Sequence, residues 1–401
     1  MVKKTGARAG NRQRRSSLPI PGTTDFQNTK KQTTKTTSKK PAPAKKEAPQ
    51  QDEAPTPSPE DEATTHHQQF TLEIFKTTFS DVLSSSTFKT TLQSVKQALF
   101  DRDFARAFST EEYLRVYAAR YSPTRAVCYT SVLTSVQDHL NSIATPTASS
   151  DQDGPTPTPP MPVPAPVQVL KHLSIGGGAA ETVAFGSFLR LSLSSSSSPA
   201  LRGEITLLDS AAWGPVVSSL TSTLTSPPTS CSDSEGSGSE PFIPASLFTS
   251  TFSQTDAFTL DGSTLPSLLG ASPLLVSLMF TLNELLTSGG IGKTTRFLLD
   301  LTSSVPVGSL LLVVDSPGSY SETTLGKEAK RYPMQWLLDR IMLGTQKDPV
   351  GGRRWKKLES EDSVWCRLSE RLEYPIRLEN MRYQLHLYKA EDASSTTSEE
   401  K

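Results

Sequence analysis

The sequence predicts an α/β protein with a seven-stranded, mostly parallel sheet, preceded by a small all-α domain and a disordered basic tail. Three observations indicate this arrangement. A glycine turn joins an apolar run to a segment with helical spacing within Val169–Leu191. Further apolar runs follow it, and some of them end in an acid. Helical periodicity dominates the stretch before it, and basic, proline-rich sequence comes first.

The basic tail is the first segment of the chain. Residues 1–46 hold thirteen Lys or Arg residues and one acid, Asp25, although the 401-residue chain has a formal net charge of zero. Residues 1–65 cannot bury enough apolar surface to fold, so we expect disorder. A basic arm on an acidic body is typical of nucleic-acid binding or nuclear targeting, and a solvated tail without a partner is the alternative. We expect the nucleus or nucleolus, with the cytoplasm left open.

Residues 66–143 are expected to form the helical domain, with four helices. Ser109, followed by Glu112, has the pattern of a capping box before one of them. Ser122 and Pro123 predict the start of the next helix, because proline is tolerated in a first helical turn.

Arg120, Tyr121 and Arg125 lie around this predicted helix junction. A contact with RNA and ordinary capping and packing both remain open for them.

Composition divides the rest of the chain. Residues 144–166 are proline-rich and predict a linker. The α/β domain is expected over residues 167–390, with a disordered Ser-, Pro- and Gly-rich insertion at 222–244. Residues 391–401 are expected to be a disordered acidic tail.

The glycine turn consists of Gly176, Gly177 and Gly178, directly after the first predicted strand. We expect Gly176 and Gly178 to take positive φ and to let the backbone approach a ligand. Free N–H groups at the start of the next helix would then bind an anionic or polar cofactor group. A glycine turn alone is weak evidence, because many such loops bind nothing.

Asp209 ends the second predicted strand, where nucleotide-binding α/β folds hold ribose hydroxyls. No phosphate-binding arginine follows it, which favours S-adenosyl-L-methionine over a dinucleotide. Gln254 and Asp256 follow the third predicted strand; if the chain resembles Rossmann methyltransferases, which present an acid or amide to the adenine amino group from this segment, they are the candidates for that contact.

The motif Ser174-x-Gly176-x-Gly178-x-Ala180 resembles the first motif of class I methyltransferases, usually acid-x-Gly-x-Gly-x-Gly. Ser174 replaces the acid and Ala180 replaces the last glycine. The resemblance implies a Rossmann-like sheet and S-adenosyl-L-methionine as cofactor, held by backbone groups and by Asp209.

The fourth and fifth strands are predicted within Ser272–Leu286 and Gly308–Ser321. Ligands of such sheets bind at the carboxyl ends of the strands. The polar residues at these two ends are Thr281, Asn283, Glu284 and Asp315.

A helix over residues 334–343 and strands near 364–368 and 383–388 complete the predicted sheet. Gly289–Thr295 resembles a phosphate-binding loop, but Thr287 stands where its first glycine belongs, so we expect a helix-to-helix loop.

The three cysteines are far apart and predict no metal site in a reduced, intracellular protein. No apolar run is long enough for a membrane span. The sequence does not predict an oligomeric state.

Six segments together closely resemble the fungal S-adenosylmethionine-dependent methyltransferases that modify N3 of a uridine in large-subunit (25S) ribosomal RNA. They are IGGGAAE, FTLNEL, LLLVVDSPGSYS, YPMQWLLD, DSVWCRL and LENMRYQLHLY. The resemblance covers about residues 70–389 and implies a class I fold, the same cofactor and ribosomal RNA as partner.

Under this resemblance, Glu284 and Asp315 are the candidates to remove the N3 proton, and Asn283 to hold the uracil carbonyls. Glu284 as a helix N-terminal acid and Asp315 as a turn former are the structural alternatives. Tyr320 and Trp336 could stack on a base, and buried packing is the alternative for Trp336.

Two other functions stay open. A protein methyltransferase would use the same cofactor half. A non-catalytic ribosome-assembly factor with a methyltransferase-like fold is conceivable because Ser174 and Ala180 depart from the motif.

Overall fold

The computed structural model describes residues 59–146, 167–193, 200–228, 240–318, 320–325 and 328–396, with side chains left undescribed around 319–331. The described residues belong to one compact unit, residues 57–401. Most of the expected basic tail and linker, and the centre of the expected insertion, lie outside the described residues. The division of this unit into a helical domain and an α/β domain stays a prediction.

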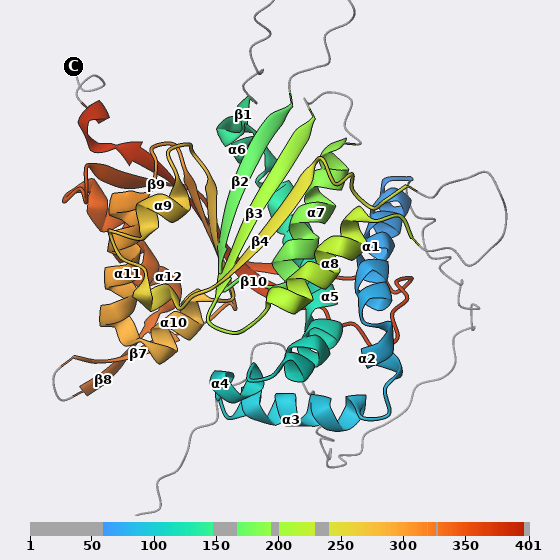
Figure 1. The fold of residues 1–401 in the computed structure, drawn as a ribbon. Helices are drawn as coiled ribbons and strands as arrows, with labels where there is room; N and C mark the ends of the chain where they lie inside the picture. The colour runs from blue at the N-terminus through green and yellow to red at the C-terminus, as the bar shows by residue number, and fades with distance from the viewer. Residues whose placement is uncertain are drawn as a thin grey trace, which may run out of the picture. The chain divides into compact units, whose positions relative to one another are not determined.

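The centre of the unit is a mostly parallel sheet with the strand order β4-β3-β2-β5-β6-β10-β9 (Figure 1). β10 runs antiparallel to both β6 and β9, and the other neighbours on this path are parallel. The seven-stranded α/β sheet predicted from the sequence is therefore confirmed. The strands on this path are β2 (Gln168–Ile175), β3 (Leu201–Asp209), β4 (Phe248–Gln254), β5 (Leu275–Met279), β6 (Leu310–Asp315), β9 (Arg353–Cys366) and β10 (Met381–Asp392).

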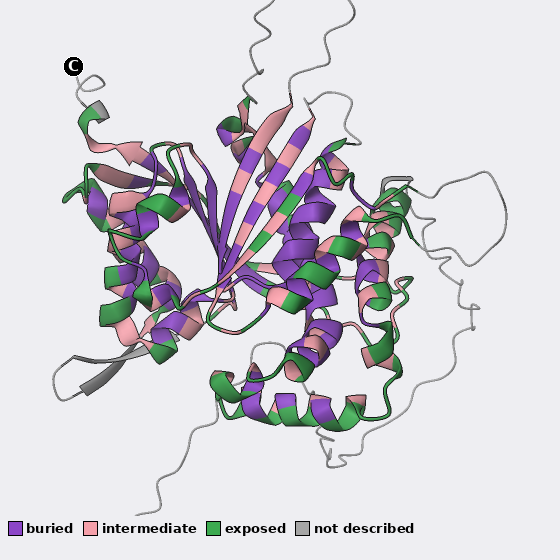
Figure 2. Ribbon diagram, in the orientation of Figure 1, coloured by how far each residue is buried: buried purple, intermediate pink, exposed green. Residues whose placement is uncertain are grey.

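Alternating side chains of the buried strands face two apolar cores, as the period of two in a strand requires. Leu310, Leu312 and Val314 of β6 face one core, whereas Leu311 and Val313 face the other. β5 and β6 are accordingly buried along their length, whereas β2 and β3 also include half-buried residues, and the helices expose their outer sides (Figure 2). Because both faces are covered, β5 and β6 read as continuous apolar runs, which is why the sequence predicts them well.

Helices cover both faces of the sheet (Figure 1). One face carries α7 (Ala179–Leu193) and α8 (Gly214–Thr225), and α1 (Pro59–Thr78) and α5 (Glu111–Ser135) pack against them. The core on the other face contains residues of α9 (Leu265–Leu269), α10 (Leu282–Ser288), α11 (Gly290–Ser304) and α12 (Met334–Met342).

The segment before the sheet holds six described helices instead of the four predicted. They are α1 (Pro59–Thr78), α2 (Ser80–Ser84), α3 (Phe88–Phe100), α4 (Phe104–Ala107), α5 (Glu111–Ser135) and α6 (Gln137–Ile143). The predicted cap residue was wrong by one position: Thr110, not Ser109, caps α5, and its hydroxyl accepts the Tyr113 N–H at 3.2 Å.

The predicted helix start at Ser122 and Pro123 is wrong, because α5 runs through Pro123 without a break. Proline has no N–H, so it cannot donate to the carbonyl four residues earlier, that of Ala119. The Tyr374 hydroxyl, from the segment between β9 and β10, donates to that carbonyl instead at 2.8 Å. A tertiary hydrogen bond thus replaces the missing helical one.

Several predicted boundaries also need correction. Residues 59–65, expected in the tail, begin α1. Thr145 and Pro146, expected in the linker, form β1, an eighth strand antiparallel to β2. The expected insertion at 222–244 is ordered at both ends, because Leu224 lies in α8 and Ile243 is fully buried.

The C-terminal and phosphate-loop-like segments differ from expectation as well. Residues 391–396, expected in the acidic tail, end β10 and form a short 3-10 helix. Of the phosphate-loop-like segment only Gly289 joins helices, and residues 290–295 are the start of α11. A hairpin of β7 (Tyr320–Leu325) and β8 (Glu328–Pro333) follows β6, and the sequence does not predict it.

Candidate active site

The glycine turn lies at the carboxyl end of β2. Close contacts with neighbouring side chains explain why its residues are glycines. Gly176 has φ +71°, and a Cβ there would lie 2.3 Å from the Thr281 Oγ1. Gly178 does not have the positive φ we expected. Glycine is needed there because a Cβ would lie 3.0 Å from the Trp213 ring. The turn therefore packs directly on the chain that follows β5 and on the start of α8.

The backbone N–H groups of the three glycines are bonded within the protein, and the expectation of free N–H groups at the start of α7 stays a prediction. Gly176 and Gly177 both donate to the Leu208 carbonyl, at 2.7 and 3.3 Å. Gly178 donates at 2.8 Å to the carboxylate of Glu181, which is buried in the first turn of α7. Burial raises the pKa of Glu181, and the N–H of Gly178 acts against that rise. These three glycines let Thr281, Ser174 and Trp213 pack closely on the turn, and their own N–H groups are not available as donors for an anion.

Asp209 ends β3 beside this turn. One of its carboxylate oxygens accepts the Ala211 N–H at 2.7 Å, and the structure records no hydrogen bond of the other oxygen to any described residue. Burial raises the pKa of Asp209 to about 6, with a smaller rise from the charge of Asp256. The second oxygen is thus the group that could hold ribose hydroxyls.

Gln254 and Asp256 both lie at the carboxyl end of β4, and both side chains are exposed. The Gln254 amide donates to the Ser210 carbonyl at 3.1 Å. The Asp256 carboxylate accepts the Phe258 N–H at 2.9 Å and so caps a 3-10 turn. The structure brings both to the Asp209 end of the sheet, and their adenine contact stays a prediction.

Asp315 is the last residue of β6 and is buried, with 1% of its surface exposed. Its two carboxylate oxygens accept backbone N–H groups, one from Asn283 at 3.0 Å and one from Ser316 at 2.7 Å. Burial raises its pKa to about 6, although these two donors act against the rise. Asp315 thereby fixes the first turn of α10, which the Thr281 side chain does not cap.

Glu284 lies in that first turn of α10. Its burial raises its pKa to about 8, and the charges of Asp209 and Asp315 add to the rise, whereas Arg125 opposes it. Asn283 precedes it; its backbone is bonded to Asp315 and Thr287, and its side-chain amide has no recorded partner among the described residues. The fixed α10 turn therefore presents an amide and a carboxyl group that is protonated at neutral pH.

Phe280 separates β5 from α10 and has φ +59°, which is unusual for a residue with a bulky side chain. Its N–H donates to the Val314 carbonyl at 2.7 Å. Its ring lies 5.2 Å from the Arg125 guanidinium and 6.3 Å from the Tyr129 ring, both of which belong to α5. Strained backbone of this kind concentrates at functional sites.

Arg125 and Tyr129 are residues whose position at the site the sequence does not predict. The Arg125 charge lowers the pKa of Glu181, Glu284 and Asp315 against the larger effect of burial. The spacing of four through Tyr117, Tyr121, Arg125 and Tyr129 could have shown that they share one helix face. From the sequence, Arg125 is a candidate only for a contact with RNA or for packing.

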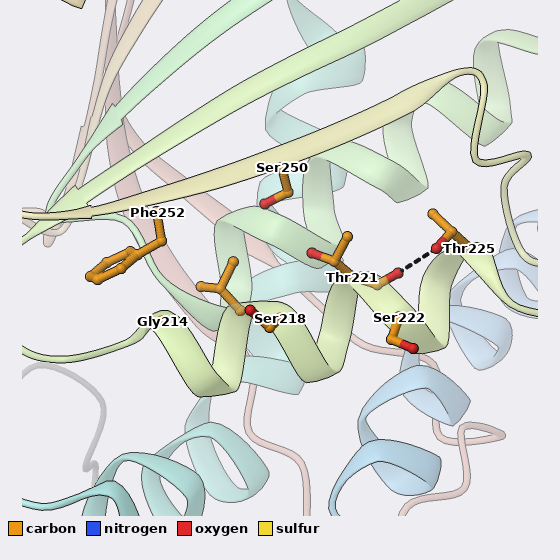
Figure 3. A pocket seen from close by; sticks show the side chains of 8 residues that line it. Gly214, Ser218, Thr221, Ser222, Thr225, Ser250 and Phe252 are labelled. Carbon is orange, nitrogen blue, oxygen red and sulfur yellow. Dashed lines mark hydrogen bonds between the residues drawn. The ribbon is translucent and has the colours of Figure 1, made fainter.

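A groove of about 470 Å³ lies elsewhere, between α8 and β4 (Figure 3). It is lined mainly by small hydroxyl side chains, such as Ser218, Thr221 and Ser250. None of the predicted site residues lines it.

Within the described ranges, no cluster of three or more His, Cys, Asp or Glu residues could hold a metal ion. No described helix is long and apolar enough to cross a membrane.

Comparison with known proteins identifies the class. Residues 75–389 match the family described as SAM-dependent methyltransferase, and the chain belongs to this family. The Saccharomyces cerevisiae protein named 25S rRNA (uridine(2843)-N(3))-methyltransferase is 31% identical over 352 residues, covering 82% of this chain and 87% of that protein. The cofactor is therefore S-adenosylmethionine.

Solved methyltransferases are more distant. An O-methyltransferase family 2 protein from Planctomyces limnophilus, in complex with apigenin, is 11% identical with a TM-score of 0.30, covering 82% of this chain and 95% of that one. An O-methyltransferase family protein from Burkholderia thailandensis is 10% identical with a TM-score of 0.35, covering 77% and 74%. Similarities this low carry no argument about function.

The described residues suit this cofactor. Asp209 has a carboxylate oxygen left for the ribose hydroxyls. The buried acids Glu181 and Asp315 suit a ligand with positive groups, such as an ammonium and a sulfonium. The Tyr129 hydroxyl is buried without a hydrogen-bond partner among the described residues, as expected of a group that meets a ligand.

Proposed function

We propose that this protein methylates N3 of a uridine in large-subunit ribosomal RNA. The yeast relative, similar over most of both chains, supports the substrate. The observation that carries the chemistry is Glu284 in the first turn of α10, where burial raises the pKa of its carboxyl group to about 8.

Methylation of N3 requires a base, because this nitrogen carries a proton. S-adenosylmethionine supplies an activated methyl group and leaves as a neutral thioether. Glu284 in its ionised form accepts the N3 proton, and a pKa near the working pH is best for that task. The Asn283 amide donates to a uracil carbonyl and so orients the base. Asp315 acts indirectly, by fixing the turn that carries both residues.

The target uridine has to be unpaired, because N3 lies on the Watson–Crick edge. An exposed aromatic surface supports such a substrate. Trp336, at the start of α12, is 47% exposed, so the packing alternative for it is wrong. It stacks on Tyr332 with ring centroids 5.0 Å apart, and Arg340 lies 5.9 Å from its ring. Stacked rings with a nearby guanidinium are suited to unpaired bases.

The test is methylation of purified large-subunit RNA with methyl-labelled S-adenosylmethionine, followed by nucleoside mass spectrometry. We expect label in 3-methyluridine, and Trp336→Ala should lower RNA affinity by about 1–3 kcal/mol, whereas Trp336→Phe should retain most of it. Label in polypeptide that survives ribonuclease would instead support a protein methyltransferase. Cofactor binding without methylation of any RNA or ribosomal precursor would leave the assembly-factor alternative.

The nucleus or nucleolus is the compartment we propose, because the proposed substrate and the basic residues 1–46 both favour it. A fluorescent fusion with and without these residues tests the proposal. Unchanged distribution of the truncated protein would remove the tail as its cause.

A further inference from the structure

An arginine of α5 lies at the candidate site with its charge unpaired among the described residues. The Arg125 guanidinium is 5.2 Å from the Phe280 ring and 5.6 Å from the Tyr117 ring. No hydrogen bond or ion pair joins it to any part of the chain that the structure describes. By contrast Arg115 and Arg120, on the same helix, pair with Asp81 and Glu379. Arg125 is only partly buried, so a ligand can reach it.

A second donor lies one helical turn further on. The Tyr129 side chain is fully buried, and its hydroxyl has no hydrogen-bond partner among the described residues. A buried hydroxyl without a partner is costly, so a ligand that accepts from it is favoured. Residues four apart share one face of a helix. The Arg125 guanidinium and the Tyr129 hydroxyl, two donors without a recorded acceptor, therefore lie on the same face of α5.

Aromatic contacts connect this place to the glycine turn. The Tyr117 ring lies 5.9 Å from the Trp213 ring, at an interplanar angle of 68°. Trp213 in turn contacts Gly178, where a Cβ would be 3.0 Å away. On its other side Arg125 contacts Phe280, directly after β5. The guanidinium therefore lies between the two turns that border the cofactor region.

The glycine turn cannot provide the anion site itself, because the N–H groups of Gly176, Gly177 and Gly178 are all bonded within the protein. The cofactor has one anionic group, the carboxylate of its methionyl part. The Arg125 charge acts on the nearby acids Glu181 and Asp315 and lowers the pKa of each against the effect of burial. A ligand that brings positive groups together with its carboxylate, as this cofactor does, therefore suits this place better than an RNA phosphate alone.

We propose that Arg125 binds the methionyl carboxylate of S-adenosylmethionine, with the Tyr129 hydroxyl as a second donor. A guanidinium presents two parallel N–H groups to a carboxylate, which makes such pairs strong and directional. This assignment makes α5 part of the cofactor site. It rests on the cofactor of the family and not on the proposed RNA substrate, so each can fail without the other.

The experiment is calorimetric titration of the full-length protein with two ligands. One is S-adenosylhomocysteine, and the other is decarboxylated S-adenosylhomocysteine, which lacks only the carboxylate. Arg125→Gln should weaken binding of the first by about 10–100-fold and leave binding of the second nearly unchanged. Tyr129→Phe keeps the packed ring and should cause a smaller loss, about 2–10-fold, for the first ligand only. The two ligands thus form a cycle with each variant.

Arg115→Gln is the matched control, because it removes a guanidinium from the same helix but away from the site, and both affinities should stay at the wild-type level. If Arg125→Gln weakens both ligands equally, or neither, Arg125 does not bind the carboxylate. Loss of RNA affinity with unchanged S-adenosylhomocysteine affinity would also overturn the proposal, in favour of a phosphate ligand. Should Arg125→Gln fail to fold, the same comparison with Tyr129→Phe decides.

Discussion

Glu284 differs from the other buried acids of the site in its hydrogen bonding. Glu181, Asp209 and Asp315 each accept a backbone N–H, which supports the ionised form. The structure records no such donor for the Glu284 side chain among the described residues. Burial and the charges of Asp209 and Asp315 together raise its pKa to about 8. Protonation of Glu284 should therefore control the reaction in the physiological range.

For Glu284→Gln we expect a methylation rate lower by about 10²–10⁴-fold, because glutamine keeps the shape but cannot accept the proton. In the wild type, kcat/KM should rise with pH up to about 8, since only the ionised carboxylate is a base. S-adenosylhomocysteine affinity, measured by titration, serves as the control and should stay near normal. A variant that methylates at the wild-type rate with the same pH profile would exclude Glu284 as the base.

Asp315 should show a structural effect instead. Asp315→Ala leaves the buried N–H groups of Asn283 and Ser316 without an acceptor, so it should lower the free energy of unfolding by about 1–3 kcal/mol. Asp315→Asn keeps one acceptor oxygen and should lose less. Chemical denaturation of both variants measures this. A fully stable Asp315→Ala variant with a large rate defect would point to direct chemistry by Asp315.

Asp209 should make cofactor binding depend on pH. With its pKa at about 6, the carboxylate is ionised above this value and protonated below it. Charge-assisted bonds to ribose hydroxyls are therefore lost as the pH falls from about 7 to about 5, and S-adenosylhomocysteine should bind more weakly. Titrations across this range should show a much smaller dependence for Asp209→Asn, with weaker binding at neutral pH. Equal slopes for both proteins would mean that Asp209 does not contact the ligand.

The elements that could be predicted from the sequence are those whose own residues determine them. β5 and β6 are apolar runs because both faces of the sheet are covered there, and β2 and β3 include apolar residues followed by the glycine turn or by Asp209. α5 could not be predicted as one helix, since the proline rule at Pro123 is overridden by Tyr374, which is far from it in the chain. The β7–β8 hairpin was missed because its strands are polar and lack an apolar run.

The residues of the candidate site likewise fall into those that could be located from the sequence and those that could not. Glu284, Asp209 and the glycine turn could be located because they follow apolar strands directly in the chain. The partners of the glycine N–H groups could not, because the Leu208 carbonyl belongs to the neighbouring strand. Arg125 could be recognised only as a residue of interest, since its place beside Phe280 depends on how α5 packs on α7.

The proline in α5 and its tertiary partner should be energetically coupled. Tyr374→Phe leaves the Ala119 carbonyl without a donor and should destabilise the protein by about 1–2 kcal/mol. In the double variant with Pro123→Ala, a backbone N–H again reaches that carbonyl, so the destabilisation should be smaller than the two single effects combined. Denaturation of the four proteins of this cycle measures the coupling. Strict additivity would show that the tyrosine does not compensate for the proline.

At the scale of the whole chain, charge should separate RNA affinity from catalysis. Residues 1–46, which lie outside the described residues, hold thirteen basic residues. Their deletion should lower RNA affinity and flatten its salt dependence, because each phosphate that the protein no longer neutralises reduces the logarithmic slope by about 0.7 on single strands. Cofactor affinity should not change. An unaltered slope would mean that the tail does not bind RNA.

The hydrogen bond between Tyr374 and the Ala119 carbonyl and the position of Arg125 also bear on how freely parts of this protein can be exchanged. A chimaera that joins the α/β part of this chain to the helices of a relative would need a compatible α5, with Pro123 facing a tyrosine and Arg125 facing Phe280. We therefore expect the α/β part and α5 to be exchanged between relatives only together. Recombination between relatives should preserve function only when residues 111–135 travel together with residues 367–380.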